Sequence, residues 1–133
     1  MPDNDLKNVK FDLGGTFNPT GCITAFFDSE ADVRRVASLI IASGSAEIDV
    51  SVFDPPHVSK WAGESLDEAG VFSSLGYGIK ILDTYKELAD ASKWFIIVRA
   101  PSKDDTSRVM QSIRSVPFMA AHKFHTLTIE DLS

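Results

Sequence analysis

Two segments of this chain repeat the same order of hydrophobic patterns, and that repetition constrains the fold more than any other feature. In each segment a continuous apolar run comes first, an amphipathic stretch with helical spacing follows, and a stretch of alternating apolar and polar residues comes last. The apolar runs are residues 22–27 and 94–98, and the alternating stretches are 48–52 and 122–129. Each segment is therefore predicted to form a strand, a helix and a second strand.

Single residues mark the ends of the two predicted helices. Asp28 or Ser29 can cap the start of the first helix by accepting a hydrogen bond from a free backbone N–H, and Gly44 is a favourable residue at its end. The second helix is expected to begin after Ser102 and to end before Pro117, because proline cannot continue a helix.

This order of elements predicts an α+β fold, the ferredoxin-like split βαβ sandwich, in which a four-stranded antiparallel sheet carries two helices. The apolar strands are expected at the centre, where cover is most complete, and the alternating strands at the edges. A length of 133 residues fits one domain, 1–133. Residues 1–20 would form an N-terminal arm, and 55–92 an insertion with helices at 61–69 and 79–91.

The two faces of the predicted sheet differ in what has to cover them. The face toward the two helices is expected to carry Ile23, Ala25, Phe27, Ile48, Val50, Val52, Leu127 and Ile129. The opposite face would carry Thr24, Phe26, Phe53 and Phe124, with either Phe95 and Ile97 or Trp94 and Ile96. Such an apolar face is expected to be covered by the insertion, by a second copy of the chain or by a ligand.

Charge and composition exclude several functional classes. The chain has 13 Lys and Arg against 19 Asp and Glu, a net charge of -6, which argues against a general nucleic-acid binder. The single cysteine, Cys22, allows neither an internal disulfide nor a Cys-rich zinc site. The apolar runs are too short to span a bilayer, and the polar, acidic residues 1–5 are unlike a secretory signal. These features predict a cytoplasmic protein without membrane contact.

No motif in the sequence assembles a catalytic or metal site. The three histidines are His57, expected in a loop, and His122 and His125, which would point to opposite faces of one strand. The glycines around Tyr77 precede a predicted helix but form no complete phosphate-binding motif. We therefore expect no catalytic residues, no metal ligands and no cofactor.

The residues from Ala25 to Asp32, with Gly44 and the strand 48–52, carry a resemblance to a known family. This part of the chain resembles the heat-induced general stress protein family, which shows a strand that ends in Phe-Asp, an amphipathic helix, a glycine and an Ile-Ser-Val-like strand. Residues 94–129 look like the returning βαβ unit of that family. The chain departs from the family in lacking a glycine-rich apolar hairpin in the middle and in its longer N-terminal arm. The resemblance implies a ferredoxin-like fold and a stress-associated role, and it transfers no site residues.

These observations lead to three functional hypotheses. The first is a non-enzymatic regulatory or binding module, a homodimer, that acts on a protein partner through the second sheet face or the insertion. The alternative is an enzyme or small-ligand protein of the dimeric α+β barrel type that binds a small apolar molecule in an aromatic cavity. The third is a purely structural assembly with a filled interface and no cavity. The candidate ligand-binding or interface residues are Phe26, Phe53, Phe95, Phe124, His57 and Tyr77.

Overall fold

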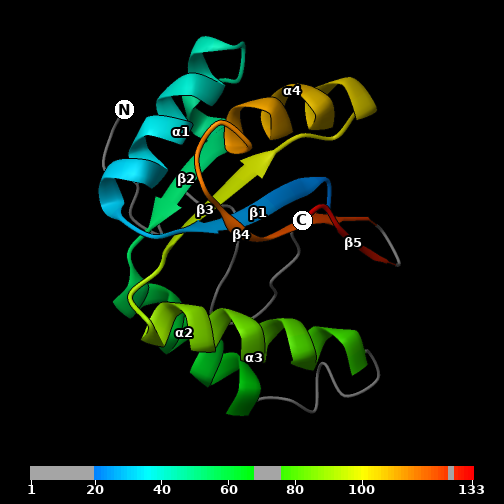
Figure 1. Ribbon diagram of the computed structural model, residues 1–133. Helices are drawn as coiled ribbons and strands as arrows, with labels where there is room; N and C mark the ends of the chain where they lie inside the picture. The colour runs from blue at the N-terminus through cyan, green and yellow to red at the C-terminus, as the bar shows by residue number, and fades with distance from the viewer. Residues whose placement is uncertain (1–19, 68–75, 126–127) are drawn as a thin grey trace.

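The computed structural model describes residues 20–67, 76–125 and 128–133 of the chain. In this part of the chain the strands are β1 (Cys22–Phe27), β2 (Val50–Phe53), β3 (Trp94–Arg99), β4 (Met119–Phe124) and β5 (Ile129–Asp131). The helices are α1 (Glu30–Ala42), α2 (Pro55–Asp67), α3 (Gly76–Asp90) and α4 (Lys103–Ile113), and a short 3-10 turn, η2 (Glu47–Asp49), precedes β2. Helices α1 and α4 cover one face of the sheet, and α2 and α3 lie on the other (Figure 1).

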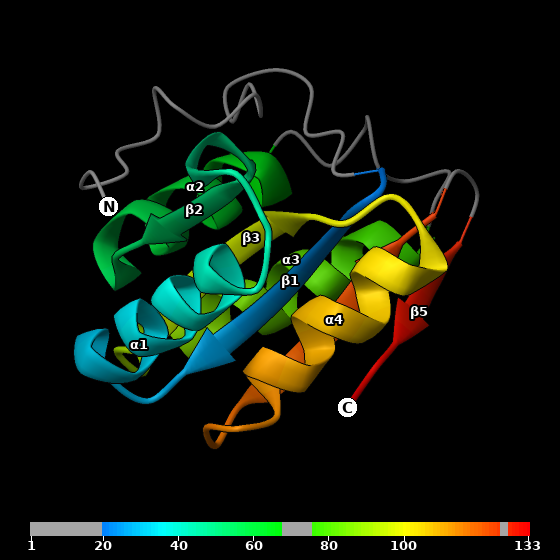
Figure 2. The ribbon, with the colours of Figure 1, turned by 90° about the horizontal axis from the view of Figure 1, so that it is seen from above.

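The sheet has the strand order β2-β3-β1-β4-β5, and every neighbouring pair is antiparallel. The α+β class and the antiparallel sheet predicted from the sequence are confirmed. The two apolar runs, β1 and β3, are neighbours in the interior of the sheet, and all six residues of β1 are buried. Seen from above, they run between the helices of the two outer layers (Figure 2).

The last strand differs from the sequence-based prediction. Residues 122–129 do not form one edge strand: β4 begins at Met119 and ends at Phe124, and β5 pairs back against it. His125 stands at the turn, where its backbone N–H donates to the carbonyl oxygen of Thr128, 2.8 Å away. The sheet therefore has five strands rather than four, and β4 is an interior strand rather than an edge. The predicted position of Leu127 lies outside the described residues.

A first apolar core fills the space between the sheet and helices α1 and α4. Each helix contributes one buried stripe: Val33, Val36, Ala37 and Ile40 from α1, and Val109, Met110 and Ile113 from α4. These side chains pack against the strand residues Ile23, Ala25, Phe27, Val50, Val52, Ile96, Val98 and Ala121. The alternation of β1 and β2 was predicted correctly at these positions, because successive side chains of a strand point to opposite faces.

Two residues assigned from the sequence to this face lie elsewhere. Ile48 is in the 3-10 turn before β2 and is 69% exposed, because the strand begins only at Val50. Ile129 packs on the α2–α3 side of the sheet, because the turn after β4 starts a new strand with its own register. Both predictions are wrong for the same reason: alternation was extended through residues where the backbone leaves the strand conformation.

The predicted helix ends are confirmed at three positions. Ser29 caps α1, its hydroxyl accepting from the backbone N–H of Asp32 at 3.2 Å. Gly44 follows α1 with a φ of 132°, a conformation that favours glycine. Ser102 and Asp105 form a reciprocal capping box at the start of α4, so two backbone N–H groups of the first turn are satisfied.

Within the described residues, no helix is both long and apolar enough to cross a membrane.

The contrast between Ile96 and Ile48 gives a first test of the fold. Ile96 is fully buried on β3, so Ile96→Ala should lower the free energy of unfolding by about 2–5 kcal/mol, through lost burial and a residual cavity. Ile48→Ala, at an exposed site, should change it by less than about 0.5 kcal/mol. Urea denaturation of both variants checks this, and comparable losses would contradict the assignment of Ile48 to an exposed turn.

Candidate functional site

The insertion covers the second face of the sheet. Of the three covers considered from the sequence, the structure has the chain's own helices α2 and α3, which pack against each other and against the sheet; we call them the α2–α3 layer. The core beneath this layer consists of Cys22, Phe26, Phe53, Val58, Trp61, Ala62, Ile81, Leu82, Tyr85, Ala89, Phe95, Ile97 and Phe124. Phe95 and Ile97 therefore face the insertion, whereas Trp94 and Ile96 face α1 and α4.

Four of the predicted site residues meet on this face. Phe26, Phe53, Phe95 and Phe124, which we call the aromatic face, are at most 7% exposed beneath the α2–α3 layer. The Phe26 and Phe95 rings lie 4.6 Å apart between centroids, and those of Phe53 and Phe95 6.1 Å apart. These separations lie in the range where aromatic pairs attract each other beyond simple burial. The sequence pattern thus placed these four side chains on one face correctly.

Tyr85 of α3 is the central contact between the α2–α3 layer and the aromatic face. Its ring centroid lies 5.1 Å from that of Phe95, 5.2 Å from that of Phe26 and 6.2 Å from that of Trp61 on α2. Tyr85 is fully buried, so its hydroxyl needs a partner inside the protein. That partner is the hydroxyl of Thr24 on β1, at 2.7 Å.

The Thr24–Tyr85 bond was not found from the sequence. Thr24 was assigned to this face and Tyr85 falls within the predicted helix 79–91, but nothing in the sequence pairs residues 61 positions apart. Burial raises the pKa of the Tyr85 phenol well above its usual range, so the group stays protonated and available for this hydrogen bond.

His57 is placed differently from its prediction. It lies in the first turn of α2, not in a loop, because the helix begins at Pro55 rather than near residue 61. The Asp54 carboxylate accepts from the His57 backbone N–H at 3.1 Å and also contacts its ring Nδ1. Asp followed by Pro is itself a helix-start signal, since Asp caps and proline fits the first turn, and the prediction of a helix at 61–69 did not use this signal. His57 is exposed and lies outside the core of the α2–α3 layer.

Tyr77 falls in the first turn of α3, and its side chain lies outside what the structure describes.

His122 on β4 lies beside the Thr24–Tyr85 bond. It is directly opposite Thr24 in the sheet, and its ring centroid is 6.5 Å from that of Tyr85. Its Nδ1 atom is buried and has no hydrogen-bond partner among the described residues. Burial lowers the pKa of His122, although the Asp131 carboxylate and the Ala120 backbone act in the opposite direction. His125, the other histidine predicted for this strand, is exposed, and its ring Nε2 contacts the Glu130 carboxylate at 3.0 Å.

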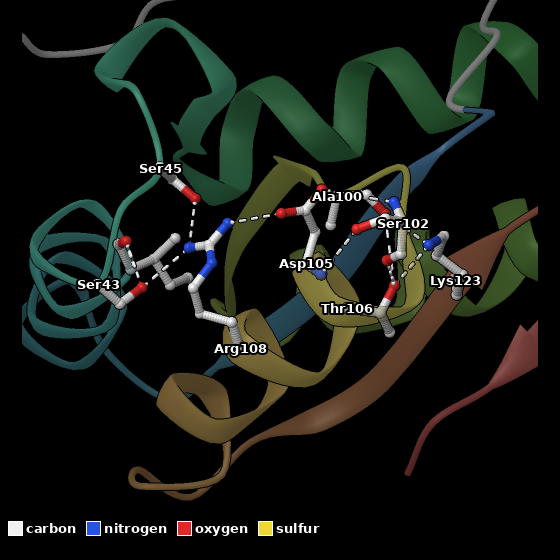
Figure 3. Close-up of polar contacts among 9 residues, drawn as sticks. Ser43, Ser45, Ala100, Ser102, Asp105, Thr106, Arg108 and Lys123 are labelled. Atoms are coloured by element: carbon white, nitrogen blue, oxygen red, sulfur yellow. Dashed lines mark hydrogen bonds and ion pairs between the residues drawn. The ribbon is translucent and has the colours of Figure 1, made fainter.

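The other side of the sheet carries a separate polar network (Figure 3). The Lys123 ammonium, on β4, donates to the Ala100 carbonyl oxygen at 2.5 Å and to the Thr106 hydroxyl at 2.6 Å, which joins β4 to the first turn of α4. The Arg108 guanidinium, on α4, donates to the hydroxyls of Ser43 and Ser45 at 2.9 Å, which joins α4 to the end of α1. We call these contacts the α1–α4 tie.

The reactive groups near these elements are held in unreactive states. Burial raises the pKa of the Cys22 thiol to about 11, so the thiol is protonated at neutral pH and is a poor nucleophile. Burial lowers the pKa of the Lys123 ammonium, but its protons are committed to the Ala100 and Thr106 oxygens. No group of three potential metal-ligating side chains occurs in the part of the chain that the structure describes.

A double-mutant cycle tests the Thr24–Tyr85 bond. Tyr85→Phe leaves the Thr24 hydroxyl buried without its partner and should lower the free energy of unfolding by about 1–3 kcal/mol. Thr24→Val should have a similar cost, but the double variant should lose much less than the sum, because it leaves neither hydroxyl unpaired. Urea denaturation measures all four proteins; strictly additive losses would contradict a direct bond between the two groups.

Comparison with known proteins gave no match of any kind: no family model, no curated protein and no solved structure is similar to this chain.

Proposed function

We propose that this protein is a non-enzymatic binding module in which the α2–α3 layer is a separable, regulatory cover over the aromatic face. The observation that carries the proposal is the difference in how the two faces of the sheet are covered. The α1–α4 tie fixes one layer by hydrogen bonds between α1, α4 and β4. The α2–α3 layer rests on the sheet by aromatic and aliphatic packing, with the Thr24–Tyr85 bond at its centre.

The polar side chains of the α2–α3 layer support its behaviour as one unit. The Ser59 hydroxyl of α2 donates to the Asp90 carboxylate of α3 at 2.5 Å, and Lys86 donates to the same carboxylate at 2.8 Å. These hydrogen bonds lower the pKa of Asp90, so the carboxylate stays ionised and keeps both partners at neutral pH. Contacts that join α2 to α3 favour movement of the two helices together.

The strand order supports a ferredoxin-like class for the fold. The strand order β2-β3-β1-β4, with α1 and α4 on one face, is the order expected of the split βαβ sandwich. Relative to that sandwich, β5 and the α2–α3 layer are additions. In such a sheet the face opposite the crossover helices is open to a partner. In this chain the aromatic face occupies that position, and its own helices take the partner's place.

The partner we propose is a protein surface that is apolar enough to replace the α2–α3 layer. A second copy of the chain, sheet against sheet, meets this requirement only when the layer has left the aromatic face. The Cys22 thiol is protonated and the Lys123 ammonium is hydrogen-bonded, and these unreactive states support a binding function rather than a catalytic one. The cytoplasmic location, the homodimer and the stress-associated role stay predictions from the sequence.

Amide hydrogen exchange tests whether the cover is separable. In the native protein the amides of α2 and α3 should exchange faster than those of α1 and β3, because the layer opens without global unfolding. Tyr85→Phe should speed exchange in α2 and α3 by roughly five- to hundredfold, the equivalent of a lost buried hydrogen bond, and leave α1 unchanged.

Arg108→Gln is the matched control, since it removes the bonds by which the α1–α4 tie joins α4 to the end of α1, on the opposite face. It should speed exchange at the end of α1 and leave α2 and α3 as they were. Equal exchange of all four helices in every variant would show one cooperative unit and would refute the proposal.

Native mass spectrometry of the protein purified from its own cells separates this proposal from the small-ligand alternative. We expect the mass of the bare polypeptide, as monomer or dimer, because the chain's own side chains fill the space over the aromatic face. Additional mass from a small molecule that disappears in Phe26→Ala, with the chain still folded, would favour the ligand-binding protein instead.

A further inference from the structure

His122 occupies a position from which its charge can act on the cover. Across the β1–β4 pairing it faces Thr24, the residue whose hydroxyl joins β1 to Tyr85 of α3. The β4 strand reaches this position through a β-bulge: the β1–β4 register shifts between Thr24 and Phe26, and Ala120 has a φ of 54°. The His122 ring lies on the side of Tyr85, the same side as Phe124 two residues further along β4.

We infer that His122 is a pH-sensitive latch, whose protonation loosens the α2–α3 layer and uncovers the aromatic face. This inference rests on the proposed function, because it takes the α2–α3 layer as a cover that can open. An imidazolium carries a proton on both ring nitrogens. Protonation would therefore place an N–H at the buried Nδ1, where no acceptor is in hydrogen-bond geometry among the described residues.

The groups around His122 compensate its positive charge only in part. The Ala120 backbone on its own strand and the Asp131 carboxylate on β5 favour the protonated form, but burial outweighs both, so the pKa of His122 stays lowered. From β1 it faces the uncharged Thr24, and from α3 the phenol of Tyr85, which stays protonated. From β5 it faces Asp131, whose carboxylate accepts from the backbone N–H of Ser133 at 2.9 Å and attracts the imidazolium, but not strongly enough to offset burial. Opening of the layer lets water reach the buried Nδ1 of this half-buried residue, so the protonated form favours the open state.

The direction of the pH effect follows from burial. The pKa of His122 is lowered from its ordinary 6.5 in the closed protein, so opening takes up a proton in the range below 6.5. The closed state is fully stable above that range and loses stability as pH falls through it. The carboxylates of Asp90, Asp105 and Asp131 have pKa values below 3.8, so their contributions are lost only at more acidic pH.

Acrylamide quenching of Trp61 follows the opening directly. Trp61 on α2 is 4% exposed and contacts Tyr85, and a Trp94→Phe background removes the second tryptophan. Between pH 7.5 and 5.0 the quenching constant of Trp61 should rise, with the opening equilibrium growing by no more than about tenfold per pH unit, the limit for one proton. His122→Gln, which cannot be charged, should abolish the rise. His125→Gln is the matched control, because His125 is exposed at the turn after β4. This variant should retain the rise.

Each outcome bears on a different claim. A rise in the Trp61 quenching constant that persists in His122→Gln, or no rise in the parent protein, overturns the latch. Whether the α2–α3 layer is separable at all is decided independently by hydrogen exchange at neutral pH. If His122→Gln does not fold, NMR titration of the parent chain replaces it: the ring signals of His122 and Tyr85 should change in one transition. A His122 transition without a change at Tyr85 overturns the inference.

Discussion

The rest of the structure depends on the burial of β1 and β3 on both faces. Every residue of β1 is buried, and the four residues 95–98 of β3 are buried with it. A strand that is apolar on both sides needs a layer of cover on each, and α1 with α4 supplies only one. The insertion is therefore part of the folding requirement: without the α2–α3 layer, four phenylalanines would face water.

The two layers meet this requirement in different ways. Arg108 and Lys123 place charged donors on several oxygens from different elements, and charge-assisted hydrogen bonds of this kind have a strict geometry. The packing of Phe26, Phe95 and Tyr85 is less directional, because apolar burial scales with area. A layer held mainly by the burial of apolar surface can be replaced by another apolar surface. A layer held by charge-assisted hydrogen bonds is harder to replace, because a substitute would have to match their geometry.

Much of the fold could be predicted from the sequence because it depends on local patterns. The order of strands and helices, the Ser29 cap and the stop at Gly44 each follow from a few neighbouring residues. The errors at Ile48 and in residues 122–129 arose where a period of two continued past the end of a strand. The Thr24–Tyr85 bond and the position of His122 beside it depend on tertiary packing and strand pairing, which a hydrophobic pattern does not encode.

A hydroxyl in the middle of an apolar strand also restricts what can bind there. Thr24 is fully buried, and in the closed protein its hydroxyl is hydrogen-bonded to that of Tyr85. Apolar packing alone would let α3 slide along the sheet, whereas one buried hydrogen bond favours a single alignment, since any other leaves two polar groups unpaired. A partner that replaces the α2–α3 layer must therefore bring a hydrogen-bonding group to Thr24 as well as apolar surface to the four phenylalanines.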